Sequence, residues 1–160
     1  MNYLALTGLL GLTGEPGGPP VQAAGQIADL GGGALMAAFG ILAALREAEQ
    51  LVDVAMADGA LSWLALVAAA CLNADGADPP ERGMLALAGG LVCYRPYACA
   101  DGGWVALGAL EPIWAAWCRG IGRADLVVEQ FAAPGSEAHA AVETIFAART
   151  RAEWEAFARP

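Results

Sequence analysis

The sequence predicts an α/β chain whose second half is α+β. Two long apolar runs, Leu30 to Leu45 and Gly59 to Ala74, contain no charged residue and are typical of buried helices. Between them, residues 51–56 alternate apolar and polar side chains, as a strand does. In the second half, two short strand-like segments flank an Asp-Gly turn, and amphipathic helices follow. These observations together favour a mixed fold with long buried helices first and a small α+β domain after them.

The first elements are an apolar segment from Asn2 to Leu12 and a loop from Thr13 to Pro20. The loop is rich in glycine and proline, which prevent regular structure there. A long helix is then expected from Gly31 to Glu49. Arg46 lies in its last turn, where a cation suits the negative end of the helix dipole. Because the rest of this helix is apolar, we expect most of it to be buried.

The strand expected at 51–56 leads into a second apolar helix. Asp58 is the expected N-cap of this helix, which reaches about Leu72. Residues 73–83 combine Asp-Gly, Asp-Pro-Pro and Arg-Gly steps and are therefore the clearest candidate linker. We place the domain boundary there, which gives domains at 1–75 and 76–160.

The second domain begins with a predicted β-hairpin. Its strands lie within Leu91–Cys99 and Trp104–Gly108, on either side of Asp101-Gly102. A helix is expected from Glu111-Pro112 onward, because proline is favoured in a first turn. Two amphipathic helices complete the domain, at about 136–148 and 151–158, the second opened by a Thr150-x-x-Glu153 capping box.

The charge of the chain excludes several partners. A net charge of −9 with eight Lys and Arg, none clustered, argues against nucleic-acid binding and against an anionic membrane surface. The uncharged runs are shorter than the roughly 20 residues that span a bilayer, so we expect no membrane insertion. Met1-Asn2-Tyr3 offers no basic start of a secretory signal. The expected compartment is the cytoplasm.

Metal binding is not expected. The cysteines at 71, 93, 99 and 118 form no C-x-x-C pair, and His139 is the only histidine. Cys93 and Cys99 could face each other across a strand or a turn, but free thiols are the expected state. His139 lies in a charged helical segment, and we expect it to be exposed to solvent.

Asp29 is the main candidate functional residue. It precedes Gly31, Gly32 and Gly33 where the chain enters a helix, so free backbone amides and closely approachable main chain are expected beside its carboxylate. Asp29 is therefore a candidate acid/base. The alternative from local sequence alone is an ordinary helix N-cap, which contributes on the order of 1 kcal/mol.

Several segments in order resemble the family III CoA-transferase superfamily and, within it, the alpha-methylacyl-CoA racemase branch. The matching stretches are Tyr3-Leu-Ala-Leu-Thr-Gly, Gly25-Gln-Ile-Ala-Asp-Leu-Gly-Gly-Gly, Gly40-Ile-Leu-Ala-Ala-Leu, Val52-Asp-Val-Ala-Met-Ala-Asp-Gly, Tyr94-Arg-Pro-Tyr-Ala-Cys-Ala-Asp-Gly-Gly and Val105-Ala-Leu-Gly-Ala-Leu-Glu-Pro. The resemblance covers nearly the whole chain. It implies the edge of a large domain followed by a small domain, within a fold that forms interlocked dimers.

The resemblance also implies roles for two acids. Asp29 matches the catalytic aspartate of the family's G-D-F-G-G-G element, and the glycines 31–33 are then expected at the substrate. Glu111 matches the catalytic glutamate of the racemase branch's G-A-x-E-P element. Taken alone, Glu111 would be an acid placed in a first helical turn to complement the dipole.

The implied reaction is epimerisation at C2 of a 2-methylacyl-CoA thioester, a step of lipid and fatty acid metabolism. A thioester acidifies its α-carbon, so one group can remove the C2 proton and another can return it on the opposite face. Amide N–H groups near Asp29 could stabilise the enolate oxygen. Neither a metal nor another cofactor is required, and acyl-CoA is the substrate.

The chain departs from the family pattern at both ends, and at its C-terminal end it stops at Pro160, where family members continue into a segment that returns to the large domain. The family's G-H-D-x-N-Y element, which carries the partner histidine, is represented only by Met1-Asn2-Tyr3, and the nucleotide-fold half is absent. We therefore expect an internal fragment that is weak or inactive alone. One alternative is a CoA-transferase with Asp29 as nucleophile. The other is a non-catalytic truncated or dimerisation module.

Overall fold

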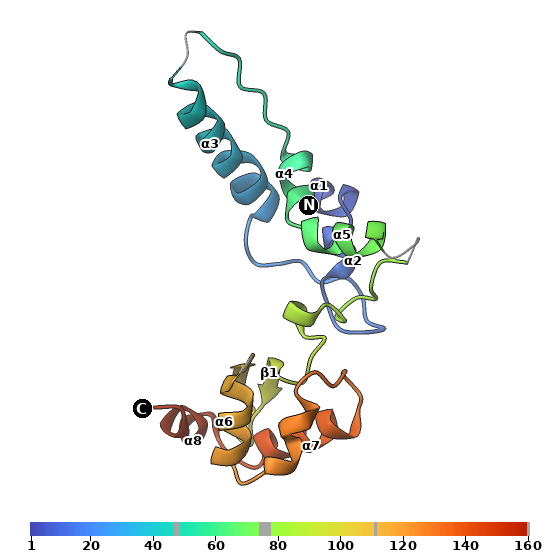
Figure 1. Cartoon of the computed structure of the whole chain (residues 1–160), viewed down its shortest axis with the longest axis vertical. Coiled ribbons are helices and arrows are strands. Elements are labelled where there is room, and N and C mark those ends of the chain that lie inside the picture. Colours follow the sequence, from blue (N-terminus) through green and yellow to red (C-terminus); the bar gives the residue numbers. More distant parts are fainter. Residues whose placement is uncertain (47–48, 74–77, 111, 160) are drawn as a thin grey trace. The chain divides into compact units, whose positions relative to one another are not determined.

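The computed structural model describes residues 1–46, 49–73, 78–110 and 112–159. The chain divides into two compact units, Met1–Arg82 and Gly83–Pro160. The division falls inside the segment 73–83 that was predicted as a linker, several residues after the boundary placed at 75. Figure 1 shows the elements of each unit.

The regular elements among the described residues of unit 1 are all helices, so the strand predicted at 51–56 is wrong. Residues 50–55 have no regular structure, and Leu51 is 94% exposed. A strand needs a neighbour for its backbone hydrogen bonds, and alternation of side chains supplies none. The helices of the unit are α1 (Asn2–Leu6), α2 (Leu9–Leu12), η1 (Ile27–Ala34), α3 (Leu35–Ala44), α4 (Met56–Ser62) and α5 (Ala65–Asn73), where η1 is a π-helix.

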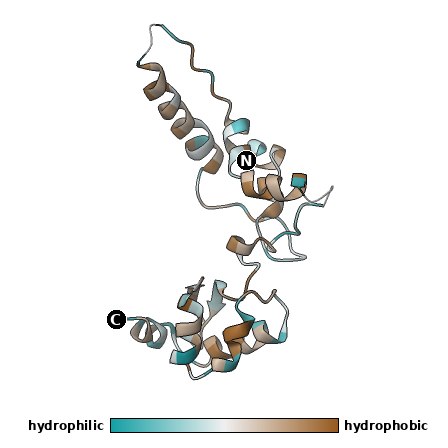
Figure 2. Ribbon diagram, in the orientation of Figure 1, coloured by the Kyte–Doolittle hydropathy of each residue, from teal (hydrophilic) through white to brown (hydrophobic). Residues whose placement is uncertain are grey.

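The long helix predicted from Gly31 to Glu49 differs from the structure in three ways. It begins earlier, at Ile27, its first eight residues are π-helical, and its α-helical part ends at Ala44. The predicted burial is also wrong, because α3 has no buried residue and Phe39 is 66% exposed. Figure 2 shows hydrophobic residues along most of the length of α3. By length and composition Ile27–Ala44 could cross a membrane, so the absence of membrane insertion stays a prediction.

The second apolar helix is two helices. Ala55 is the N-cap of α4, so the prediction that Asp58 caps it is wrong; Asp58 lies in the first turn. The chain bends by 67° between α4 and α5. An acid is favourable anywhere in a first turn, because the dipole there is positive, so residue type alone did not identify the cap.

The glycine- and proline-rich loop of unit 1 is closed by specific hydrogen bonds. The Thr13 hydroxyl donates to the Val21 carbonyl at 2.6 Å, and the Val21 amide donates to the Thr13 carbonyl at 3.1 Å. The Arg82 guanidinium donates to the carbonyls of Gly11 and Gly18. Arg82, the last residue of the unit, therefore holds both the loop and the helix that precedes it.

Unit 2 is α+β, as predicted for the second half. Strands β1 (Tyr94–Ala98) and β2 (Trp104–Gly108) pair antiparallel, with Tyr94 opposite Gly108 and Ala98 opposite Trp104. Gly102 has φ +74°, which glycine adopts without strain, so the predicted Asp-Gly turn is confirmed. The remaining elements are η2 (Ala86–Ala88), α6 (Pro112–Gly120), η3 (Ala124–Glu129), α7 (Glu137–Ala147) and α8 (Arg151–Phe157).

Both helix starts predicted near the C-terminus are confirmed. Ser136 caps α7 by accepting the His139 amide. Thr150 and Glu153 form the predicted capping box at α8, with the Glu153 carboxylate 2.7 Å from the Thr150 amide nitrogen. That amide holds the pKa of the Glu153 carboxyl below its usual value. These contacts stabilise the first turns of the last two helices.

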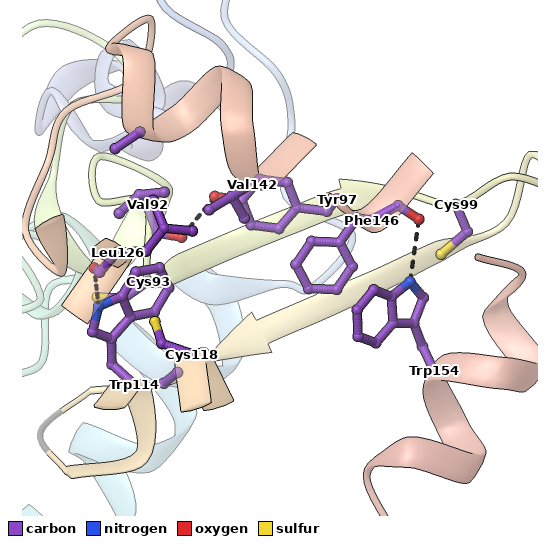
Figure 3. Close-up of a cluster of buried hydrophobic side chains, with 12 residues drawn as sticks. Val92, Cys93, Tyr97, Cys99, Trp114, Cys118, Leu126, Val142, Phe146 and Trp154 are labelled. Carbon is purple, nitrogen blue, oxygen red and sulfur yellow. Dashed lines mark hydrogen bonds between the residues drawn. The ribbon is translucent and has the colours of Figure 1, made fainter. Parts of the chain in front are cut away.

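An aromatic cluster forms the core of unit 2 (Figure 3). Phe146 stacks on Tyr97 with ring centres 4.7 Å apart and lies 4.6 Å from the ring of Trp154. Buried polar atoms of the cluster are paired: the Tyr97 hydroxyl donates to the Val92 carbonyl, and the Trp114 indole donates to the Leu126 carbonyl. Burial raises the pKa of the Tyr97 hydroxyl far above its ordinary value. All four cysteines are free thiols, as expected.

Candidate functional site

Asp29 lies in the first turn of the π-helix η1 and is exposed. The residue before the helix is Gln26, so the N-cap interpretation of Asp29 is wrong. Among the residues that the structure describes, no side chain forms a hydrogen bond or ion pair with its carboxylate. Single-turn π-helical segments are rare and occur frequently at functional sites. The structure therefore presents Asp29 as an accessible carboxylate on an unusual backbone.

The glycines that follow Asp29 pack against α4. A Cβ on Gly32 would lie 2.7 Å from the Ala60 nitrogen and 2.8 Å from the Met56 oxygen, too close for any side chain. Gly31 is also buried, and a Cβ there would meet the Trp63 ring at 2.9 Å. Two of the three glycines are thus needed for a close helix crossing. Substrate contact at Gly31, Gly32 and Gly33 stays a prediction.

The contact is made by one face of α4 and the residue after it. Met56, Gly59 and Trp63 are spaced as neighbours on a helix surface. Met56 meets Gly33, Gly59 meets Gly32, and Trp63 meets Gly31. Gly59 and Trp63 were not identified from the sequence. The helical spacing of these residues was the available signal in the sequence. It indicates a contact face only when the helix that packs against it is known.

The residue that precedes Asp29 in the sequence is also held in place. Ala28, its neighbour, is 2% exposed and forms a small core with Leu4 and Ala60. Ala60 is completely buried. The backbone around Asp29 is therefore anchored to α4 on both sides, while the carboxylate itself is in solvent.

An apolar cavity lies in the same unit, between the α1–α2 segment and the α4–α5 segment. Its volume is about 460 Å³. The Thr7 hydroxyl on its wall donates to the Tyr3 carbonyl of its own helix, so little polar chemistry is offered to a ligand. An aliphatic group is what such a lining can accept. The lining residues are Thr7, Gly8, Gly11, Leu12, Leu61, Leu64, Val67, Ala68, Cys71, Pro79 and Pro80.

Glu111, the second predicted catalytic residue, lies outside the described residues. The chain on either side of it is well anchored. Ala109 is buried, its amide donates to the Cys93 carbonyl at 2.9 Å, and its carbonyl accepts from the Gln130 side chain at 3.2 Å. Helix α6 begins at Pro112. Asp29 and Glu111 belong to different units, and their pairing in one site stays a prediction.

His139 is buried, so the prediction of solvent exposure is wrong. It is 8% exposed, its Nδ1 accepts the Gly135 amide at 2.9 Å, and its Nε2 lies 3.5 Å from a Glu143 carboxylate oxygen. Its ring also lies 6.0 Å from the ring of Tyr97. These contacts give His139 a structural role in unit 2. Within the described ranges, no three metal-ligating side chains lie together.

Comparison with known proteins identifies the family. The family model described as CoA-transferase family III matches residues 1–160. Alpha-methylacyl-CoA racemase from Mus musculus is 33% identical over 162 positions, which cover 96% of this chain and 42% of the relative. Succinyl-CoA:mesaconate CoA-transferase from Haloarcula marismortui is 33% identical over 130 positions, covering 78% of this chain and 32% of that protein.

A solved structure also matches nearly the whole chain. The crystal structure of Rv3272 from M. tuberculosis matches with a TM-score of 0.68 and 28% identity, covering 98% of this chain and 42% of that one. The present chain therefore spans less than half the length of the relatives it matches. The match to the family model nevertheless extends over residues 1–160. The chain belongs to CoA-transferase family III.

Proposed function

We propose that this chain forms part of an acyl-CoA racemase that epimerises C2 of 2-methylacyl-CoA thioesters. Asp29 is the group that exchanges a proton with C2. The observation that carries this proposal is the position of Asp29: its carboxylate is exposed on a π-helical turn whose backbone is anchored to α4. A proton-transfer group needs this combination of access and fixed position.

The proposed chemistry needs two groups on opposite faces of the substrate. One removes the C2 proton to give an enolate, and the other returns a proton to the opposite face, which inverts the centre. Asp29 takes one of these positions. The resemblance assigns the second proton transfer to Glu111, which precedes Pro112 in the sequence, together with a histidine of the kind that the racemase branch uses.

Sequence similarity supports the racemase over the other activities in the family. The racemase from Mus musculus matches over 96% of the chain, whereas the CoA-transferase from Haloarcula marismortui matches over 78%. The Glu111-Pro112 pair also resembles the racemase branch. Both arguments concern the type of reaction, and neither specifies the acyl group.

A CoA-transferase is the second candidate, because an exposed aspartate can also act as a nucleophile. Asp29 would attack the acyl carbonyl of one thioester, form a mixed anhydride and release CoA thiolate. The thiolate would then attack the aspartyl carbonyl, freeing the first carboxylate and leaving an aspartyl-CoA thioester. An acceptor carboxylate would take over the CoA in the reverse sequence. This reaction leaves C2 untouched.

The two reactions are separated by one experiment on the natural polypeptide that contains this sequence. The protein is incubated in D₂O with a (2R)-2-methylacyl-CoA and no acceptor acid, and the product is analysed by mass spectrometry and chiral chromatography. Deuterium at C2 with loss of stereochemical purity supports the racemase. CoA appearing on an added carboxylate, with C2 unlabelled, contradicts it and supports the transferase. If neither product forms, the non-catalytic module is favoured.

Assembly and location belong to the same proposal. We expect the protein to act as a homodimer in the cytoplasm. Size-exclusion chromatography with light scattering measures the assembly directly, and a strictly monomeric mass would contradict it. The apolar helix α3 supports the proposed association of two copies of the protein, because Phe39 is 66% exposed and Leu42 is 64% exposed.

A further inference from the structure

We propose that Gly59 and Trp63, at the surface that α4 presents to η1, are positioning residues for Asp29. This inference rests on the proposed function, because it concerns how the carboxylate of that site is held. Neither residue touches the carboxylate. They act through the backbone of the glycines that follow it.

The need for this support comes from Asp29 itself. Its side chain is exposed, and no described side chain bonds to its carboxylate. The direction of the carboxylate therefore depends on the backbone of η1 alone. A reacting group that is displaced by roughly 1 Å can lose about 100-fold in rate, so this backbone must be fixed.

Gly59 supplies the closest of the contacts that fix it. The backbone of Gly32 lies against the Cα of Gly59, and a Cβ added to Gly59 would overlap the Gly32 carbonyl. Both partners are main-chain atoms, so neither can rotate away. An alanine at Gly59 would force the backbones of η1 and α4 apart, because the added Cβ and the Gly32 carbonyl cannot occupy the same space. Gly32 is three residues from Asp29, within the same turn of the π-helix, so Asp29 would move with it.

Trp63 supplies a second contact one helical turn further along. A Cβ added to Gly31 would lie 2.9 Å from the nearest atom of the Trp63 ring. Trp63 is nevertheless more than half exposed. Here the clash involves a side chain that can be removed. A methyl group added at Gly31 should therefore be tolerated once Trp63 is truncated. The two contacts differ in kind, and each gives its own test.

The first test is Gly59→Ala in the polypeptide that contains this chain. We expect kcat for C2 deuterium exchange to fall about 100-fold, with KM changed less than about twofold, because binding contacts remain while the proton-transfer group is displaced. Gly25→Ala is the matched control. Gly25 is a glycine of the same unit outside the cavity lining, and a Cβ there meets nothing within 4 Å, so kcat should not change.

Three outcomes decide the proposal. A folded Gly59→Ala protein with wild-type kcat overturns it, and so does a rise in KM with kcat unchanged. Hydrogen exchange provides a readout besides activity: the amides of residues 30–34 should lose protection in Gly59→Ala and keep it in Gly25→Ala. Unchanged protection in a folded variant overturns the proposal as well.

A second pair of variants applies if Gly59→Ala does not fold. Trp63→Ala should lower kcat, Gly31→Ala should lower it more, and the two combined should return kcat to about the level of Trp63→Ala alone. A wild-type kcat in a folded Trp63→Ala protein overturns the role of Trp63. Asp29→Asn separates this inference from the proposed function: full exchange activity in Asp29→Asn defeats the proposed function, whereas the amide protection still reports whether α4 fixes the turn.

Discussion

Truncation of Phe146 to alanine tests the packing of unit 2. Phe146 is 1% exposed, and its ring lies between those of Tyr97 and Trp154 at 4.7 and 4.6 Å. Replacing a fully buried phenylalanine with alanine costs about 3–5 kcal/mol, which includes the lost transfer free energy and the cavity left behind. For a unit of this size, each kcal/mol lowers the melting temperature by about 4–8 °C. We therefore expect a decrease of more than about 12 °C.

The assay is thermal unfolding followed by near-ultraviolet circular dichroism, which reports the environment of the stacked rings. Phe131→Ala is the matched control, because Phe131 lies in the same unit but is 65% exposed; its loss should stay within about 1 kcal/mol. A loss below about 1 kcal/mol for Phe146→Ala would refute the reasoning. That result would mean that the aromatic cluster is not the core that holds unit 2 together.

The remaining predictions concern a helix start and two cysteines. Thr150→Ala removes the cap of α8 and should lower the stability of unit 2 by about 1 kcal/mol in urea unfolding, whereas Thr150→Ser should keep most of it; equal losses would contradict the capping role. Iodoacetamide at pH 8 should modify half-buried Cys71 before buried Cys118, measured by peptide mass spectrometry, and the reverse order would be inconsistent with the structure. Burial raises the pKa of the Cys118 thiol from 9.0 to about 11, so the fold favours the neutral form. That stabilisation is complete below pH 9 and is lost as pH rises through about 11, and Cys118→Ala should show a smaller alkaline loss.

Local signals in the sequence predicted unit 2 well. The Asp101-Gly102 turn and the Thr150-x-x-Glu153 pair each specify a backbone geometry within a few residues, so no distant partner was needed. His139 was the exception. It is three residues before Val142 and seven before Phe146, on the buried face of α7, and this spacing was the signal against an exposed position.

Unit 1 was predicted less well because its structure depends on contacts distant in sequence. The alternation at 51–56 lacks a neighbouring strand among the described residues, and the apolar pattern of α3 does not specify what would cover it. The run Gly31 to Gly33 could equally serve close approach of substrate or close packing of helices. Only the positions of Gly59 and Trp63, more than twenty residues later, show that packing accounts for Gly32 and Gly31.

The candidate site shows the same limit. The sequence identified Asp29, and the structure places it exposed on a fixed turn, although as part of a π-helix rather than as an N-cap. Residue type and a resembling motif can select a carboxylate. The anchoring of its backbone to α4 depends on atoms that no local pattern contains.

The most direct measurement of the central claim is the rate of C2 deuterium exchange in Asp29→Asn, compared with wild type and with Asp53→Asn. Asparagine keeps the shape of the side chain but cannot take up a proton, and Asp53 is an exposed aspartate of the same unit. Loss of a general acid/base reduces rate by about 100- to 10,000-fold. We predict a loss in that range for Asp29→Asn and none for Asp53→Asn. Exchange at the wild-type rate in a folded Asp29→Asn protein would contradict the assignment of Asp29 as the proton-transfer group.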